Sequence, residues 1–185
     1  MKEMKVHIVS AGTLCPMARF VSFDGKWFQK GLMSCNCLVI ESNHGLLVVD
    51  TGIGSRGIDN PKKYIGDTFL YSAFPKLSYE HTLKYRIEKL GFACKDVRHI
   101  FLTHLDLDHA GGLYDFRSAV VHVFYDEYQA TKGVGSSSYQ ILRYRIANWE
   151  HDVNWFFEQM GNETLFGISN VNDIFGDQSI MMIPL

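Results

Sequence analysis

The sequence lacks any long hydrophobic run. It contains no stretch of about 18 or more apolar residues, the length that an α-helix needs to cross a membrane. Its first residues, MKEMKVHIVSAG, hold one short apolar stretch that His7 interrupts, and this does not match a secretion signal. We therefore expect a soluble, cytoplasmic protein without a membrane partner.

Cysteine is scarce, and neither sign of charge dominates. The 18 Lys and Arg residues nearly balance the 20 Asp and Glu residues, and the net charge of −2 offers no general attraction to polyanions. A nucleic-acid partner is therefore not expected. The 4 cysteines follow no regular framework, which indicates reduced thiols. Cys35 and Cys37 alternate on an expected strand, which favours packing on one face over metal binding.

Length and composition indicate one globular domain over residues 1–185, of which 46% are hydrophobic. Short apolar segments predict strands at 4–10, 35–41, 46–50, 98–103, 119–125 and 179–185. Helical periodicity predicts helices at 80–92, capped by Ser78 and stopped by Gly91, at 126–132, and within 139–160. Glycine, proline and polar residues predict a surface loop at 52–68 and a flexible loop at 133–138.

The stretch THLDLDHAGG, residues 103–112, concentrates ligand-type side chains directly after an expected strand. His104, Asp106, Asp108 and His109 are all side chains that bind divalent metals, and a rigid sheet can aim them. Their spacing suits two adjacent metals, which could share a bridging hydroxide and polarise a carbonyl or phosphoryl oxygen. The alternative is a polar loop in which Asp108 caps the next helix.

The same stretch resembles the H-x-[HDE]-x-D-H-x-G signature of the metallo-β-lactamase fold superfamily. LLVVDTGIG, residues 46–54, resembles that superfamily's strand ending in Asp-Thr-Gly. The segments CNCLVIES, HLDLDHAGGL and VHVFYDEY are most similar to the branch of metallo-hydrolases that includes N-acyl homoserine lactone lactonases. The resemblance implies an α/β (α+β) fold, the αββα sandwich of that superfamily.

The resemblance also implies a role for each residue of the motif. His104 and Asp106 would bind the first metal, and Asp108 and His109 the second, while Asp50 would lie behind them and order the loop. In the signature of that superfamily, histidine is commoner than aspartate at the place that Asp106 occupies here. Zinc remains the first choice for the two divalent metals, with iron or manganese as the alternatives that a harder ligand favours.

The implied activity is hydrolysis of a small molecule with a carbonyl group, such as a lactone or an ester. A metal-bridging hydroxide, oriented by Asp108, would attack that carbonyl. Tyr64, Phe69, Tyr71 and Phe74 are candidates for an apolar wall along an acyl chain. Two alternatives are a non-catalytic remnant or interaction module, and a di-iron redox protein of the same fold with a carboxylate at position 106. The oligomeric state stays open.

The downstream ligands of the superfamily are not found. After His109 the sequence has two further histidines, His122 and His151, and neither lies in a Gly-His-Thr-x-Gly-His context. His122 alternates with valines on a strand and is expected to be structural, as is His151, although His151 could line a pocket. We expect the N-terminal portion of a longer protein with much of the second half missing, and an isolated chain that is inactive.

Overall fold

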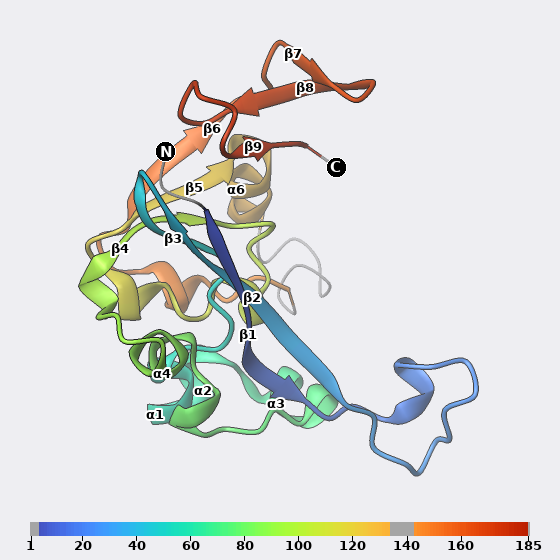
Figure 1. Cartoon of the computed structure of the whole chain (residues 1–185). Helices are drawn as coiled ribbons and strands as arrows, with labels where there is room; N and C mark the ends of the chain where they lie inside the picture. The colour runs from blue at the N-terminus through green and yellow to red at the C-terminus, as the bar shows by residue number, and fades with distance from the viewer. Residues whose placement is uncertain (1–3, 134–142, 185) are drawn as a thin grey trace.

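The computed structural model describes residues 4–133 and 143–184, which form a mixed α/β fold with two sheets (Figure 1). The larger sheet has the strand order β1-β2-β3-β4-β5-β6. Its strands are β1 (Lys5–Leu14), β2 (Met33–Ser42), β3 (Gly45–Val49), β4 (Val97–Phe101), β5 (Val120–Phe124) and β6 (Asn154–Glu158). The smaller sheet consists of β7 (Glu163–Leu165), β8 (Ile168–Asp173) and β9 (Met181–Met182).

The larger sheet is mixed, with antiparallel pairs at one end and parallel pairs at the other. The β1–β2 and β2–β3 pairs are antiparallel, as expected from the turn at residues 42–45, whereas β3, β4, β5 and β6 run parallel. Parallel strands need a crossover connection, and here short helices supply it. The helices are α1 (Ser55–Asp59), α2 (Pro61–Tyr64), α3 (Asp67–Ala73), α4 (Leu83–Lys89), α5 (Leu107–Ala110) and α6 (Tyr125–Lys132).

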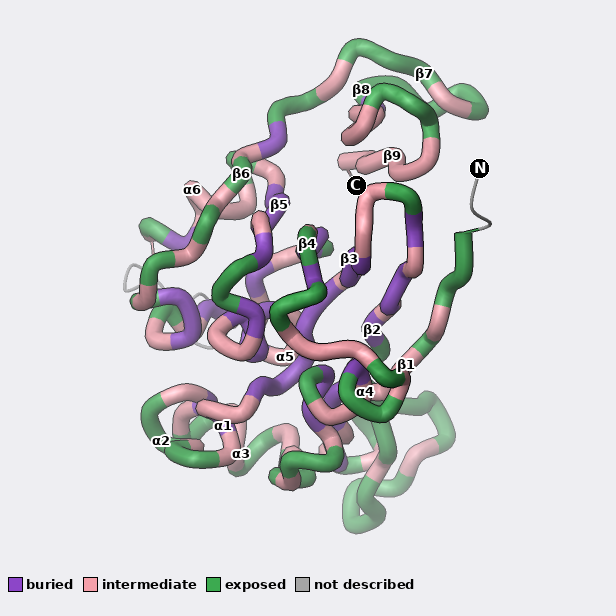
Figure 2. Tube along the Cα trace, turned by 60° about the vertical axis from the view of Figure 1, so that its left-hand side comes forward, coloured by how far each residue is buried: buried purple, intermediate pink, exposed green. Residues whose placement is uncertain are grey.

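The two faces of the larger sheet are covered differently. On one face, Val39, Val48 and Ile100 pack against Leu83 and Ile87 of α4 and against residues following α5. On the other face, Ile40, Leu47 and Phe101 pack against side chains between β8 and the end of the chain, namely Ile174, Phe175, Ile180 and Met182. Figure 2 shows the resulting concentration of buried residues in the central strands. No helix within the described residues is long and apolar enough to cross a membrane.

Cys35 and Cys37 are both buried on β2, which confirms that they share one face. Burial raises the pKa of the Cys35 thiol to about 12. Because the thiolate is the form that binds metals, this environment supports a packing role.

Two sequence predictions were wrong about the kind of element. Residues 52–68 are not an irregular loop, because α1, α2 and the start of α3 occupy them, with Ile53 and Ile65 buried in the core. The predicted helix within 139–160 is also wrong from residue 144 onward, where a 3-10 turn (Ile146–Trp149) is followed by strand β6. Residues 134–142, which include most of the predicted flexible loop and the start of that helix, lie outside the described residues.

Two further predictions were wrong about boundaries. Helix α4 is capped by Thr82, whose hydroxyl accepts a hydrogen bond from the Tyr85 amide, so Ser78 is not its cap. The predicted terminal strand shortens to the two residues of β9. Gly91, by contrast, follows α4 with a φ of 90°, as a helix stop requires.

His122 is held inside the sheet by a chain of polar contacts. Its Nδ1 lies 2.9 Å from Glu158 Oε1 and its Nε2 lies 2.9 Å from His99 Nδ1. Burial lowers the pKa of His122 and outweighs the Glu158 carboxylate, which acts to raise it. Burial likewise lowers the pKa of His99. The folded chain therefore favours neutral imidazoles at both positions, as expected for a structural His122.

These lowered pKa values predict that the chain loses stability in mild acid. Near the usual histidine pKa, His99 and His122 bind protons in the unfolded chain but stay neutral in the folded chain. The free energy of unfolding therefore falls as pH decreases from 7 to 5. His122 contributes at most about 1.4 kcal/mol per pH unit. Urea unfolding across this range measures the effect. His109, whose pKa is raised, contributes in the opposite direction in both chains, so the comparison with His122→Gln isolates the effect. This variant does not titrate at position 122 and should have a flatter profile, and equal slopes in the two chains would contradict the prediction.

Candidate metal centre

The motif lies where two parallel strands end side by side. Asp50 directly follows β3, and Thr103 follows β4 after one further residue. Because β3 and β4 are parallel, their carboxyl ends meet at one edge of the sheet, and the Asp50 amide donates to the Phe101 carbonyl at 2.9 Å. Helix α5 then begins at Leu107. The backbone thus places residues 103–109 against Asp50, the residue that follows β3.

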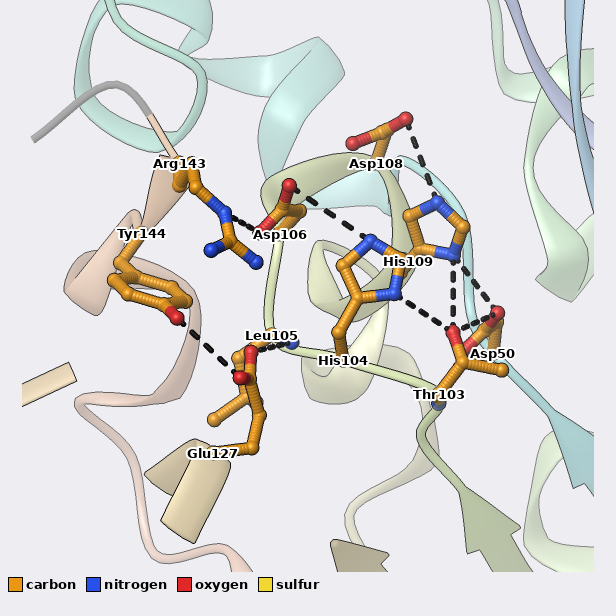
Figure 3. A network of polar contacts seen from close by, with 10 residues as sticks. All are labelled: Asp50, Thr103, His104, Leu105, Asp106, Asp108, His109, Glu127, Arg143 and Tyr144. Carbon is orange, nitrogen blue, oxygen red and sulfur yellow. Dashed lines mark hydrogen bonds and ion pairs between the residues drawn. The ribbon is translucent and has the colours of Figure 1, made fainter. Parts of the chain in front are cut away.

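Asp50 connects both ends of the motif. Its carboxylate accepts hydrogen bonds from the Thr103 amide at 2.9 Å and the Thr103 hydroxyl at 2.8 Å, and it lies 2.8 Å from His109 Nδ1 (Figure 3). Asp50 is 4% exposed and has a φ of 59°, a conformation that aspartate tolerates better than most residues. The geometry therefore agrees with the expected position of Asp50 behind the motif.

The hydrogen bonds of Asp50 determine which nitrogen of each histidine is available. An ionised carboxylate only accepts hydrogen bonds, so His109 Nδ1 must carry a proton and donate it to Asp50. Thr103 has one hydroxyl hydrogen and donates it to Asp50, so it accepts from His104 Nδ1 at 2.9 Å. In the neutral imidazoles, the lone pair of each ring is therefore on Nε2, where a metal could bind it.

The four predicted ligands are arranged as two neighbouring pairs. His104 Nε2 lies 3.7 Å from Asp106 Oδ2, and His109 Nε2 lies 3.7 Å from Asp108 Oδ2. The centroids of the two imidazole rings are 3.9 Å apart. The two nitrogen–oxygen distances of 3.7 Å each leave room for a zinc ion that binds both atoms at about 2.0–2.2 Å. The donor set and its arrangement fit two divalent metals, each with one histidine and one aspartate.

The charges around the motif favour a cation. Burial acts to lower the pKa of His109, but the hydrogen bond to Asp50 and the charges of Asp50, Asp108 and Asp106 outweigh it and raise that pKa. Metal binding must therefore displace a proton from His109 at lower pH. The same negative charges that attract the proton would attract a divalent metal.

No group of three or more His, Cys, Asp or Glu side chains suited to a metal ion occurs within residues 4–133 and 143–184. His122 does not complete the centre, because Glu158 and His99 occupy its two ring nitrogens. His151 lies beside Tyr114, with ring centroids 5.2 Å apart, and its buried Nδ1 has no hydrogen-bond partner among the described residues. The described residues thus provide two protein ligands for each metal.

Sequence reasoning missed three residues around the motif. Arg143 Nε donates to Asp106 Oδ1 at 2.8 Å. Glu127 Oε1 accepts from the Leu105 amide at 2.8 Å, and its Oε2 accepts from the Tyr144 hydroxyl at 3.3 Å. The acidic residue at the start of an expected helix was a visible signal for Glu127, whereas Arg143 and Tyr144 follow no motif.

A cavity of about 1010 Å³ borders His104. It is lined by Thr103, His104, Glu127 and Arg143, and by apolar residues that include Phe101, Met160 and Met182. The expected apolar wall does not form its lining: Phe69 packs into the core, and Tyr71 and Phe74 are exposed. Side chains from α6 and the end of the chain take that place instead.

Glycines allow the motif to pack tightly against the segment after β3. A Cβ added to Gly112 would lie 2.6 Å from the Thr51 carbonyl oxygen, and one added to Gly111 would lie 2.9 Å from the Gly52 oxygen. Gly52 itself has a φ of 64°, and its added Cβ would lie 2.0 Å from the Ala11 oxygen. The two glycines of the motif therefore allow its backbone to approach residues 51–52 closely.

A positive φ alone costs a residue with a Cβ about 1–2 kcal/mol. Replacing Gly52 with alanine is predicted to lower the free energy of unfolding by more than this. The additional cost comes from the contact with the Ala11 carbonyl. The matched control is Gly91→Ala, which also has a positive φ of 90° but would meet no atom within 4 Å. Urea unfolding compares the two variants. An equal loss of stability would contradict the role assigned to the contact.

The chain matches one protein family over most of its length. Residues 31–179 match the family described as the Metallo-beta-lactamase superfamily. A probable metallo-hydrolase of Mycobacterium bovis is 38% identical over 148 residues, which cover 80% of this chain and 43% of that protein. An N-acyl homoserine lactonase of a Bacillus species is 28% identical over 96 residues, covering 52% of this chain and 38% of that protein. The chain thus spans about two fifths of the length of these relatives.

Solved structures show the same fold. The AiiA lactonase variant of B. thuringiensis, with N-decanoyl-L-homoserine bound at its active site, superposes with a TM-score of 0.70 at 22% identity, covering 90% of this chain and 64% of that chain. An N-acyl homoserine lactone hydrolase with N-hexanoyl-L-homoserine at its catalytic metal centre matches equally, with the same TM-score of 0.70 and the same coverage. The expected fold is confirmed.

Proposed function

Because the chain belongs to the metallo-β-lactamase superfamily, we propose that it carries the metal-binding part of a metal-dependent hydrolase. The observation that carries this proposal is the arrangement of two His–Asp pairs, His104 with Asp106 and His109 with Asp108, side by side at the sheet edge. His104 and Asp106 would hold one divalent metal and Asp108 and His109 a second, with zinc as the first choice. When bound, such metals act as Lewis acids that polarise a carbonyl oxygen.

Asp108 and Asp50 would have further roles beside the metals. Asp108 presents a carboxylate beside His109 and would orient an attacking water by accepting its hydrogen bond. Asp50 would place the single proton of each neutral imidazole on Nδ1, directly for His109 and through Thr103 for His104, so that Nε2 carries the lone pair. Catalytic zinc normally has three protein ligands, whereas each pair provides two, so we propose that this chain carries part of the full site.

The proposed substrate is a small molecule with a carbonyl group, and a lactone is the first choice. The names of the Bacillus relatives and the ligands of the solved structures support this choice. The cavity beside His104 has both polar and apolar lining, as a lactone with an acyl chain requires.

The test is zinc-dependent binding of N-hexanoyl-L-homoserine, the ring-opened product, measured by calorimetry. We expect binding to the chain with zinc, no binding after chelation, and weakened binding in His104→Ala. Hydrolysis of the parent lactone is expected to be slow, because each metal has two protein ligands. A zinc-loaded chain that binds neither product nor lactone would contradict the proposed substrate class.

A further inference from the structure

The two oxygens of Asp106 have different neighbours. Oδ2 faces His104 Nε2 at 3.7 Å, whereas Oδ1 accepts a hydrogen bond from Arg143 Nε at 2.8 Å. Figure 3 shows the Asp106 carboxylate between the guanidinium group and the imidazole. Asp106 therefore belongs to an ion pair and to the proposed first metal position at the same time.

Arg143 is placed beside Asp106 by the segment that carries it. The next residue, Tyr144, forms an antiparallel backbone bridge with Asp106, is 3% exposed, and donates its hydroxyl to Glu127. Arg145 then donates to the carbonyl groups of Lys62 and Lys63 at 2.8 and 2.7 Å. The contacts of the two residues that follow Arg143 thus hold this part of the backbone next to Asp106.

The ion pair changes the charge at the first metal position. Residue 106 is an aspartate, at a place where the signature quoted above also admits a histidine. A neutral imidazole carries no net charge, and neither does an aspartate paired with an arginine. An Asp106 without Arg143 would add one negative charge, and a histidine in place of Asp106 would leave the Arg143 guanidinium beside the first metal position without the Asp106 carboxylate, which disfavours a metal ion.

We propose that Arg143 is a positioning residue for the first metal. It holds Asp106 through Oδ1, leaves Oδ2 directed at His104, and balances the charge so that the Asp106–Arg143 pair replaces a neutral histidine. The inference rests on the proposed function, because it assigns Arg143 a task at the proposed metal site.

The test compares zinc affinity in four chains: wild type, Asp106→His, Arg143→Met and the double variant. Competition with a chromophoric chelator provides the readout, independently of activity. We expect Asp106→His alone to bind zinc at least about 10-fold more weakly, because Arg143 loses its carboxylate and faces the metal. Adding Arg143→Met should restore the affinity to near that of wild type. Arg117→Met, which removes an arginine elsewhere, should change nothing.

Additive effects of the two substitutions would overturn the inference and leave the proposed function standing. A wild-type chain that binds no zinc would count against the proposed function instead. In that case the pairing is tested in the zinc-free chain by urea unfolding. If Asp106 and Arg143 act as one unit, the double variant Asp106→Asn with Arg143→Met should unfold at the same urea midpoint as Asp106→Asn alone. A further, additive loss of stability in the double variant would overturn the inference.

Discussion

Replacing Asp50 with asparagine is expected to weaken zinc binding by about 10–100-fold, the usual cost of removing a partner of a metal-binding histidine. The Asp50 carboxylate accepts from the Thr103 amide, the Thr103 hydroxyl and His109 Nδ1. An asparagine offers one accepting oxygen and one donating nitrogen, so at least one of these donors must face another donor. Where the amide faces His109 Nδ1, the ring proton moves to Nε2 and blocks the atom that would bind the metal.

Thr103→Val is the matched control for this prediction. It removes the hydroxyl that accepts from His104 Nδ1 but leaves the contact between Asp50 and His109. We expect a smaller loss of zinc affinity, confined to the position that His104 serves. Nitrogen chemical shifts of the imidazoles in the zinc-free chain report the tautomers directly. Unchanged His109 shifts in Asp50→Asn, together with wild-type zinc affinity, would show that Asp50 does not set the tautomer.

Replacing His122 with alanine is expected to lower the free energy of unfolding by about 3–5 kcal/mol, because the buried Glu158 carboxylate loses a hydrogen-bond donor and a cavity replaces the imidazole ring. His122 and Glu158 are 4% and 7% exposed, and the substitution leaves the Glu158 carboxylate without the imidazole beside it. It also opens space between Phe101 and Phe156, whose rings lie 4.6 and 5.2 Å from that of His122.

His122→Gln provides the comparison, because its amide can still donate to Glu158. We expect this variant to lose about 1 kcal/mol, the order of one altered hydrogen bond. Equilibrium urea unfolding at pH 7 measures both. If the alanine and glutamine variants lose the same amount, the contact with Glu158 does not stabilise the sheet. Zinc affinity should stay unchanged in His122→Gln, since His122 lies outside the motif.

The motif was predictable from the sequence because it is local. Its four ligand-type residues occur within six positions directly after a strand, so the chain fixes their proximity before any distant contact forms. The position of Asp50 was predicted from the family resemblance, and the structure places it directly after β3, which runs parallel to β4. Arg143 was not predictable, since 37 residues separate it from Asp106 and no pattern marks it.

The elements that sequence reasoning missed were short or ambiguous. In residues 52–68, the polar residues and proline do not break structure but begin helices: Pro61 starts α2, Asn60 caps it, and Asp67 lies in the first turn of α3. In β6, aromatic side chains occupy both faces, with Phe157 partly buried and Phe156 53% exposed. Such a run does not alternate cleanly, and its spacing also fits a helix.

The central claim is that His104, Asp106, Asp108 and His109 form two metal positions. The most direct test is elemental analysis of the chain after equilibrium dialysis against saturating zinc, beside His104→Ala and His109→Ala. We predict two zinc ions per wild-type chain and about one in each variant, because each substitution removes the nitrogen ligand of one pair. A wild-type chain that binds no zinc, or two zinc ions per chain in both variants, would contradict the claim.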